Sequence, residues 1–454
     1  MALIELDLTD QPGPAPSSPP PAHLYRLPGL ILAAVLVLAA GAAAPAGPTL
    51  WRYLGSLPVT PGLEEPFELT GGRAYTMNEI GPGRQVTAWS LAEPPQQLWQ
   101  TRYDLPARDQ DAIGFGGFHV ERAGDVVLIS HGPSATVLDG HSGQVRWSTG
   151  TPVAAMAGGR IGLIQEPRFR PGTVYDQESG APGQLWFTAG GEPHDEPPSR
   201  TDLRGVDLYT GATVWSRSVP GAVIAETAPG DAPAVLLLSS TGMERLDGVT
   251  GRPVHRTAPP KVDGRSPLSG EIIGDLMMIY YYDTEGYATH EAAYAPGDLA
   301  PLWVRDVPPA PVQRAACTGL VCSDEEAGLA VLDPATGRPM WRAPTGVDLI
   351  RRGGYLLEQE TSTGTLVRLV DPPTGTSRVD LDRWPAEVVG GSDESIVLRR
   401  GLEKGVSAFG VIDAGHDRVQ PLGTTAMAIS DCQADSRYVV CRAQDSLRVW
   451  AYRG

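Results

Sequence analysis

The stretch Leu332–Trp341, L-D-P-A-T-G-R-P-M-W, fits a spaced pattern, D-x-x-[ST]-G-x-x-x-W, in which one strand ends, a tight turn follows and the next strand begins. Asp333 can accept hydrogen bonds from backbone N–H groups across the turn, and Gly337 supplies the positive φ that a compact hairpin needs. Trp341 falls on the returning strand, where its large ring can cover the seam between neighbouring modules. The stretch therefore predicts a β-hairpin that also contacts the next structural unit.

The same pattern recurs along almost the whole chain after residue 50. Three copies keep the Asp, the Gly and the Trp, two copies lose the Trp, and degraded copies end at Trp99 and Trp303 or surround Asp413. The spacing is roughly 40 residues, which is typical of four-stranded β-propeller blades. One long step contains an insertion at residues 166–204. The structural repeat residues are Asp139, Gly143, Trp147, Asp207, Gly211, Trp215, Asp247, Gly251, Asp333, Gly337, Trp341, Asp371 and Gly375.

Each repeat contains four short strands separated by turn signals. Residues 112–150 show them as G-F-H-V-E-R-A-G, D-V-V-L-I-S, A-T-V-L-D and V-R-W-S-T. The chain ends with only three strands, so we predict that residues 50–57 supply the fourth and close the ring, which leaves no exposed edge. We expect an all-β fold, a β-propeller of four-stranded blades over residues 50–454. Literal counting gives nine segments, but propellers commonly stop at about eight, so we predict eight blades, with seven or nine as alternatives.

An uncharged segment precedes the repeats. Residues 27–51 carry no charged side chain, and as a helix they would be about 37 Å long, enough to cross a hydrocarbon core of about 30 Å. We predict one transmembrane helix at residues 27–49, preceded by a disordered, Pro-rich cytoplasmic tail at residues 1–26. A cleaved signal peptide is the alternative, with an A-x-A site at Ala42–Ala44. Against it, acidic residues give the preceding segment the wrong charge for an n-region.

The four cysteines lie late in the chain, in two local pairs. Cys317 and Cys322, and likewise Cys432 and Cys441, bracket predicted hairpin tips, so we expect two disulfides, each across its own turn. A zinc site is the alternative, but the spacings are unusual for zinc and no histidine is near in sequence. Disulfides require an oxidising compartment. We therefore place the protein in the cell membrane as a single-pass protein with its C-terminal propeller on the extracellular side.

Charge and composition exclude one class of partner. The formal net charge is −17, and an acidic surface repels phosphate backbones, so we expect no nucleic-acid binding. The basic residues are almost all Arg, and together with many Ala, Gly and Pro residues they are typical of a high-GC bacterial genome.

The repeat resembles that of the PQQ-like, or quinoprotein-type, β-propeller proteins, over roughly residues 50–454. The residues that carry the resemblance are Asp333, Thr336, Gly337 and Trp341, together with their counterparts in the other copies. The resemblance implies that Trp147, Trp215 and Trp341 dock onto neighbouring blades. The family includes quinone-cofactor dehydrogenases, so a PQQ-dependent or other propeller-based enzyme, an oxidoreductase or hydrolase, is the alternative function. This chain lacks the adjacent cysteines of those enzymes, and Asn78 is its only asparagine.

The best sequence candidate for specificity is the insertion at residues 166–204, because function in a propeller tends to lie on loops. Its residues Arg168, Arg170, Tyr175, Trp186, Phe187, His194 and Asp195 are of the types that interfaces use. The segment H-E-A-A-Y at residues 290–294 misses the H-E-x-x-H zinc motif and has the pattern of a strand. At residues 280–282 three tyrosines could form an aromatic patch, but at least one must face the core.

We predict no catalytic, metal-binding or cofactor-binding residues. The most consistent function is a non-catalytic, membrane-tethered extracellular β-propeller that acts as a binding or scaffold module for a protein or glycan partner.

Overall fold

The computed structural model describes residues 51–58, 65–80, 83–104, 117–176, 178, 180, 185–239, 241–267, 269–283, 287–307, 317–325, 328–388, 390, 395–413 and 416–452. The predicted cytoplasmic tail and transmembrane helix, residues 1–49, lie outside these ranges and remain predictions. Within them, no helix is both long enough and apolar enough to cross a membrane. The chain from Leu50 to Gly454 forms one compact unit, which is described below.

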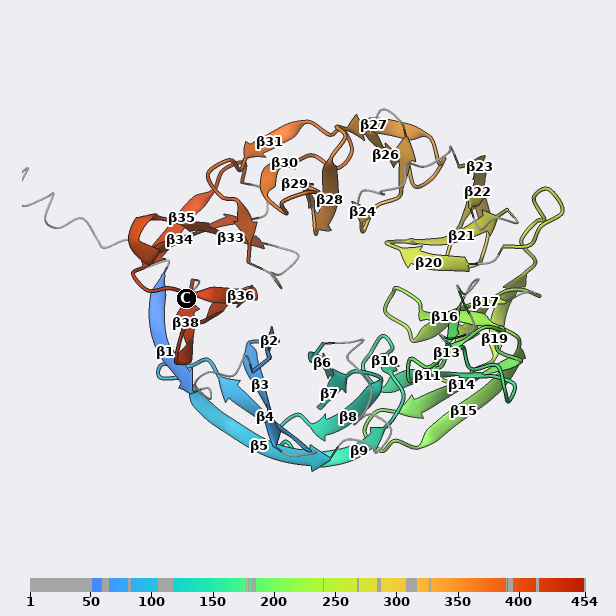
Figure 1. Ribbon diagram of the computed structural model, residues 1–454, viewed down its shortest axis with the longest axis horizontal. Helices are drawn as coiled ribbons and strands as arrows, with labels where there is room; N and C mark the ends of the chain where they lie inside the picture. The colour runs from blue at the N-terminus through green and yellow to red at the C-terminus, as the bar shows by residue number, and fades with distance from the viewer. Residues whose placement is uncertain are drawn as a thin grey trace, which may run out of the picture. The chain divides into compact units, whose positions relative to one another are not determined.

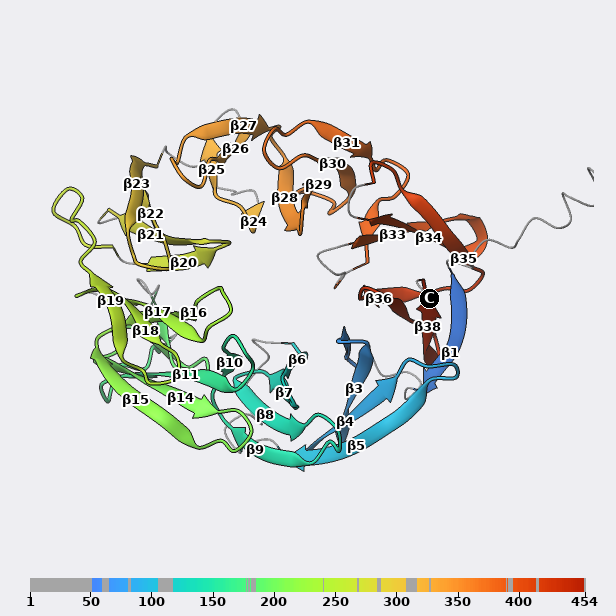
Figure 2. The ribbon, with the colours of Figure 1, turned by 180° about the vertical axis from the view of Figure 1, so that it is seen from behind.

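Short antiparallel strands follow one another around a ring (Figures 1 and 2). We number the blades in chain order and call the strands of each blade A to D from the centre of the ring outward. Blades 1 to 3 are β2 (Phe67–Thr70), β3 (Arg73–Ile80), β4 (Gly83–Ser90) and β5 (Gln96–Asp104); β6 (His119–Ala123), β7 (Val126–His131), β8 (Ser134–Asp139) and β9 (Val145–Thr149); and β10 (Val153–Ala155), β11 (Ile161–Arg168), β14 (Arg200–Asp207) and β15 (Thr213–Pro220).

Blades 4 to 6 are β16 (Val223–Thr227), β17 (Ala234–Ser239), β18 (Gly242–Asp247) and β19 (Pro253–Thr257); β20 (Ser269–Ile273), β21 (Leu276–Tyr282), β22 (Ala288–Tyr294) and β23 (Pro301–Asp306); and β24 (Cys317–Thr318), β25 (Cys322–Glu325), β26 (Gly328–Leu332) and β27 (Pro339–Ala343). Two further strands, β12 (Trp186–Phe187) and β13 (Pro193–His194), form a hairpin between β11 and β14.

Blades 7 to 9 are β28 (Val347–Arg352), β29 (Tyr355–Glu360), β30 (Leu366–Val370) and β31 (Ser377–Asp380); β32 (Ala386–Glu387), β33 (Ser395–Gly401), β34 (Ser407–Asp413) and β35 (Gln420–Thr425); and β36 (Ser430–Ala434), β37 (Tyr438–Arg442), β38 (Ser446–Ala451) and, from the start of the unit, β1 (Arg52–Pro58). A 3-10 turn, η3 (Glu403–Gly405), precedes β34.

The described residues form nine blades, seven of which are four-stranded sheets, so the all-β propeller is confirmed and the predicted count of eight is wrong. Literal counting of the repeats gave the correct number. Blade 8 has no tryptophan at the end of its pattern, yet the first four residues of β33 and nearly all of β34 are buried. A blade therefore needs apolar strands that pack against its neighbours, and the turn motif is dispensable.

The ring closes as predicted, because β1 supplies the outer strand of the last blade. It pairs antiparallel with β38, from Arg52 opposite Ala451 to Pro58 opposite Ser446. The preceding residue, Trp51, stacks on Phe409 with ring centroids 4.7 Å apart, and on Trp450 at 5.5 Å. Closure thus joins the two ends of the unit by backbone hydrogen bonds and by a cluster of aromatic rings.

The turn of the repeat, which joins strands C and D, is organised by its aspartate. In blade 4, Asp247 Oδ1 accepts hydrogen bonds from the Thr250 hydroxyl at 2.8 Å and from the backbone N–H groups of Thr250 and Val249 at 2.8 and 3.1 Å. These hydrogen bonds, the Thr250 hydroxyl foremost, lower the pKa of Asp247 below its ordinary value against the opposing effect of burial. The charged carboxylate therefore fixes the turn.

The tryptophan of each repeat docks on the turn of the next blade. Trp215 Nε1 donates to the backbone carbonyl of Gly248 at 2.7 Å, and its ring covers Gly251, where an added Cβ would lie 2.6 Å from the ring. The glycine also has a φ of +67°, so both its backbone conformation and its neighbour exclude a side chain. The same contact joins Trp99 to Gly143, Trp147 to Gly211, Trp303 to Gly337 and Trp341 to Gly375.

Where a blade lacks the tryptophan, the next blade lacks the glycine. His255 takes the tryptophan position of blade 4, and the turn of blade 5 has Leu299 at the glycine position, with a φ of +60°. Val379 takes the tryptophan position of blade 7, and Asp417 occupies the glycine position of blade 8. The two residues therefore behave as one unit of blade-to-blade packing.

This docking predicts how a glycine substitution behaves. Gly251→Ala should destabilise the full-length protein in urea unfolding more than Gly158→Ala, whose glycine also has a positive φ but has no heavy atom within 4 Å of an added Cβ. We expect about 1 kcal/mol for Gly158→Ala from the left-handed backbone alone, and at least about twice that for Gly251→Ala. In a Trp215→Ala background the two costs should become equal. Equal costs in the wild-type background would contradict the steric role of the ring.

Candidate functional site: a crevice between blades 5 and 6

The regular ring is interrupted where blade 6 begins. Its innermost strand, β24, pairs in parallel with β28 of blade 7, with Cys317 opposite Leu349 and Thr318 opposite Ile350. Blade 6 keeps a three-stranded sheet, β25–β26–β27, and blade 7 has five strands. Elsewhere in the ring, innermost strands of adjacent blades contact each other without joining one sheet, as β2 does with β6 and β16 with β20. Because β24 belongs to the sheet of blade 7, β25 becomes the inner edge of blade 6.

Both predicted disulfides are present, and one of them holds this irregular strand. Cys432 and Cys441 lie opposite each other on the antiparallel strands β36 and β37, as expected. Cys317 and Cys322 are also bonded, but they link β24 to β25, which belong to different sheets. The Cys317–Cys322 disulfide therefore links the sheet of blade 6 covalently to β24, which pairs with the sheet of blade 7.

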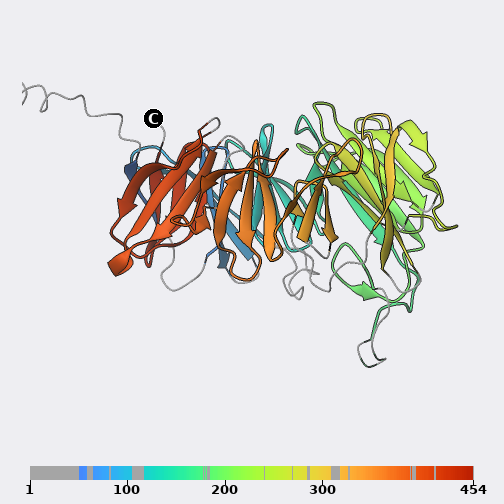
Figure 3. The ribbon, with the colours of Figure 1, turned by 90° about the horizontal axis from the view of Figure 1, so that it is seen from above.

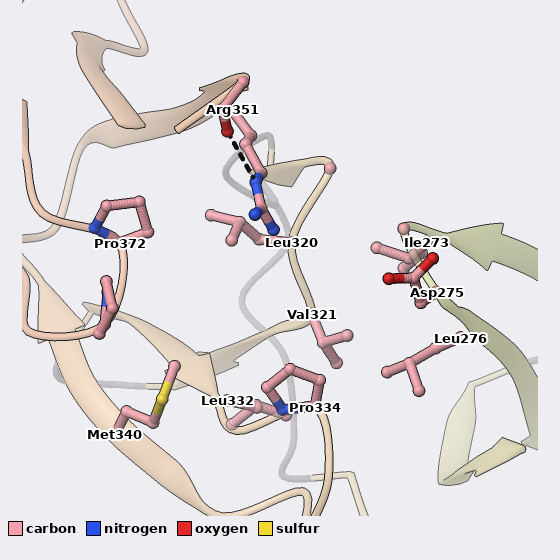
Figure 4. A pocket seen from close by; sticks show the side chains of 14 residues that line it. Ile273, Asp275, Leu276, Leu320, Val321, Leu332, Pro334, Met340, Arg351 and Pro372 are labelled. Carbon is pink, nitrogen blue, oxygen red and sulfur yellow. Dashed lines mark hydrogen bonds between the residues drawn. The ribbon is translucent and has the colours of Figure 1, made fainter. Parts of the chain in front are cut away.

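An apolar groove of about 660 Å³ lies at the boundary between blades 5 and 6, on the end of the ring that carries the repeat turns. Ile273, Asp275 and Leu276 of blade 5 face Val321 and Pro334 of blade 6 across it (Figure 4). Leu276, Val321 and Leu332 belong to the core between these blades and form its buried part. We define the groove by Ile273, Leu276, Leu320, Val321, Leu332, Pro334, Met340, Pro372 and Pro373, with Asp275 and Arg351 as its charged members.

Two repeat turns form part of the groove as well as part of the blade packing. The carbonyl of Pro334 accepts a hydrogen bond from Trp303 Nε1 at 2.9 Å, and that of Pro372 accepts one from Trp341 Nε1 at 2.8 Å. Both prolines follow the aspartate of a repeat, a position that holds Gly140, Leu208 and Gly248 in other copies. The backbone of these turns seals the blades, and their side chains line the groove.

A polar pocket of about 390 Å³ occupies the same boundary farther along the strands. It shares strand β20 with the groove, since Glu271 lines the pocket and Ile273 lines the groove. The two cavities also meet in sequence at Val321 and Cys322. We define the pocket by Ser269, Glu271, Tyr280, Tyr282, Glu291, Cys322, Ser323 and Asp324, and we call groove and pocket together the crevice.

Hydrogen bonds within the pocket leave its acidic character intact. The Tyr280 hydroxyl donates to Glu271 Oε1 at 2.6 Å, and the hydroxyls of Ser269 and Tyr282 lie 2.8 Å apart. Burial, and then the hydrogen bond to Glu271, raise the pKa of Tyr280, so this tyrosine stays neutral. A neutral donor satisfies one lone pair of Glu271 but does not compensate its charge.

Glu291 is the buried carboxylate of the pocket. It lies in β22 within the sequence that misses the zinc motif, so this segment is a strand as predicted. Its Oε1 lies 2.7 Å from Arg305 Nε of the neighbouring strand β23, and the Glu291 side chain is only 7% exposed. Throughout the described ranges, no group of three His, Cys, Asp or Glu side chains could hold a metal ion.

The insertion that the sequence favoured lies elsewhere. Strands β11 and β14 stay paired up to Arg168 and Arg200, so residues 166–168 and 200–204 belong to regular strands. The hairpin β12–β13 joins strands B and C, so it lies at the end of the ring opposite the repeat turns, where it projects in green (Figure 3). None of the predicted residues in the insertion lines the crevice.

The insertion uses most of its candidate residues for its own structure. His194 is buried, stacks on Phe169 with ring centroids 3.8 Å apart, and shares a hydrogen bond of 2.9 Å with Thr173. The remaining candidates behave in the same way: Arg168 pairs with Asp202, Arg170 with Glu196, the Tyr175 hydroxyl with the Gly180 carbonyl, Trp186 with His194 in the hairpin ladder, and the Asp195 N–H with the Thr173 carbonyl. Phe187 is the exception, since it is 54% exposed.

Sequence reasoning missed the groove, although one signal pointed to it. Only the copies D-P-A-T-G and D-P-P-T-G carry proline directly after the aspartate, and both prolines line the groove. The sequence did indicate part of the pocket, because residues 280–282 were recognised as a possible aromatic patch. Tyr281 is the core residue, and Tyr280 and Tyr282 line the pocket.

The fold and strand pairing define this unit as a β-propeller. No model of a known protein family matches the chain, and no curated protein matches it in sequence. Among solved structures, BamB from Moraxella catarrhalis is 12% identical, with 88% of this chain and 97% of that chain covered and a TM-score of 0.38. A eukaryotic initiation factor is 11% identical, with 81% and 91% covered and a TM-score of 0.45. These identities are too low to transfer a function.

The buried ion pair beside the pocket leads to a stability prediction. Arg305→Ala should cost about 3 kcal/mol or more in urea unfolding, because it leaves Glu291 buried without its cation. Arg342→Ala is the matched control: its partner Glu325 lies 2.8 Å away, but the Arg342 side chain is 50% exposed. An exposed pair of this kind contributes about 1 kcal/mol or less. Equal effects of the two substitutions would show that burial of Glu291 does not matter.

Proposed function

We propose that this chain is a membrane-tethered β-propeller scaffold that binds an extended segment of a partner protein in the apolar groove. The groove itself carries the proposal. Its volume of about 660 Å³ falls within the roughly 300–1,000 Å³ of ligand sites, and its lining is almost entirely aliphatic side chains and prolines. Met340, which is 42% exposed, offers a flexible apolar contact at its border.

The lining favours a protein over a glycan. Sugars are bound by aromatic platforms and dense polar contacts, whereas no aromatic side chain lines the described groove. Leucine, isoleucine, valine and methionine side chains form a surface that matches apolar side chains of a peptide. A glycan partner is therefore the outcome that the binding experiment below has to exclude.

Charge specifies the partner further. The chain carries a net charge of −17, and the pocket that continues the groove is lined by Glu271, Asp324 and Glu291, of which Glu291 is paired with Arg305. A partner segment with net positive charge would be attracted to this surface and would associate faster at low ionic strength.

We place the propeller outside the membrane, with residues 27–49 as the anchor and residues 1–26 in the cytoplasm. The two disulfides support this orientation, since such bonds persist in oxidising compartments. Protease added to intact cells should then digest the propeller after its disulfides are reduced, and leave an epitope tag at the N-terminus protected. Loss of the tag while the propeller survives would reverse the orientation.

A substitution at the border of the groove tests the proposed function. Met340→Glu should abolish binding of the partner, because a carboxylate in an apolar groove must be desolvated. Met427→Glu is the matched control, since Met427 is similarly exposed, at 36%, but lies outside the groove. The partner segment is to be identified by photo-crosslinking from position 340 in intact membranes, then synthesised and titrated against both full-length variants.

Equal binding by the two variants would overturn the proposal. It would also fail if the species crosslinked from position 340 proved to be a glycan.

A further inference from the structure

We infer that the polar pocket is the binding site for a primary ammonium or guanidinium group, carried by a lysine or arginine side chain of the segment in the groove. This inference rests on the proposed function and names the chemistry of the anchor. It assigns a cation-binding role to Glu271 and Ser323, which lie between blades 5 and 6.

The first observation is a buried hydroxyl that lines the pocket without a partner. Ser323 is only 5% exposed, and its Oγ has no hydrogen-bond partner among the described residues. An unsatisfied buried hydroxyl costs about 1–3 kcal/mol. A ligand that donates a hydrogen bond to this oxygen, or accepts one from its O–H, removes that cost, so the pocket is prepared for a hydrogen-bonding group.

The second observation is the charge of the walls. Glu271 is exposed and receives a hydrogen bond only from the neutral Tyr280 hydroxyl among the contacts described above, so its negative charge remains available. Arg305 compensates Glu291, the deepest carboxylate, but not Glu271 across the pocket. The negative charge of Glu271 therefore favours a cation as the group that donates a hydrogen bond to Ser323 Oγ.

Volume and arrangement distinguish an organic cation from a bare metal ion. About 390 Å³ holds many waters, each of which takes about 30 Å³ in the liquid. The carboxylates of the described residues do not converge as a metal site requires. Several N–H donors on a flexible stem can reach separate acceptors, as an ammonium or guanidinium group does.

The continuity of the crevice links this site to the groove. Glu271 and Ile273 lie on one strand, two residues apart, and line the pocket and the groove respectively. Side chains two apart in a strand project to the same face. An extended peptide with an apolar side chain in the groove can therefore place a basic side chain in the pocket.

The test uses the full-length protein and acetylated hexapeptide amides composed of apolar residues, with lysine or norleucine scanned through each position. Norleucine retains the apolar stem of lysine but has no ammonium group. We expect lysine at one position to improve the Kd by about tenfold or more, the gain of roughly one charge-assisted hydrogen bond. The gain should fall below threefold in Glu271→Gln and in Ser323→Ala, and persist in the control Glu403→Gln, an exposed residue outside the crevice.

Ser323→Ala separates a binding role from a structural one. Because the hydroxyl has no partner in the free protein, its removal should leave the Tm unchanged or raise it while the lysine preference is lost. A lower Tm would show that the hydroxyl supports the fold and would overturn its assignment to the ligand.

The outcomes for this inference and for the proposed function are distinct. Peptide binding that Met340→Glu abolishes, but that shows no preference for lysine over norleucine, overturns the inference and leaves the proposed function standing. A lysine preference that survives both Glu271→Gln and Ser323→Ala also overturns it, because the cation is then bound elsewhere. If no peptide binds in a manner sensitive to Met340→Glu, the proposed function itself fails.

Discussion

The contact between a tryptophan and the glycine turn of the next blade is the constraint on which this propeller depends. A four-stranded blade is apolar on both faces and cannot bury them alone, so each blade needs a fixed distance and angle to its neighbour. The indole ring of Trp215 sets this distance by lying directly on the backbone at Gly251. Its N–H group sets the angle by bonding the Gly248 carbonyl. Five boundaries of the ring repeat this arrangement among the described residues.

The paired losses show why the motif degrades in units. If the tryptophan is absent, no ring requires a glycine in the turn of the next blade. If the glycine is absent, its replacement occupies the space in which the tryptophan ring would lie. His255 and Leu299 illustrate the result, since the ring is absent and the buried leucine fills the turn of the next blade. Leu299 keeps a φ of +60°, so the backbone course of the turn persists after the packing that selected it has changed.

Much of the fold could be predicted from the sequence because it follows local rules. Turn residues and apolar strands repeat, and each copy reports on the others, so the propeller, the ring closure and the disulfide pairs were predictable. The blade count was wrong because a prior on propeller size outweighed direct counting of apolar strands. The parallel pairing of β24 with β28 could not be predicted from the sequence. Strand β24 has only two residues, Cys317 and Thr318, which are too few to show a pattern that identifies a partner strand.

The insertion stays a prediction of the sequence, whereas the structure directs attention to the crevice. Loop length and residue type favoured the insertion, but most of its candidate residues bond within the insertion, as His194 Nδ1 does with Thr173. The crevice lies instead where a strand changes its partner, and the lining of its groove comes mainly from five turns of three consecutive blades, spread over residues 273–373. In the sequence, the prolines after two repeat aspartates marked the groove, and the three-tyrosine segment marked the pocket. Variation inside the repeated turn pattern therefore marked the apolar groove, which the length of the insertion did not.

The same turns therefore serve two purposes through different atoms. Pro334 gives its carbonyl oxygen to Trp303 and its ring to the groove. A backbone acceptor is available whatever the side chain, so blade packing leaves the residue after the aspartate free to vary. A repeat that secures its blades through glycine and backbone atoms can change its exposed side chains without loss of the ring. In this propeller the residue after the aspartate is proline in the two turns that line the groove, next to the point where β24 pairs with the sheet of blade 7.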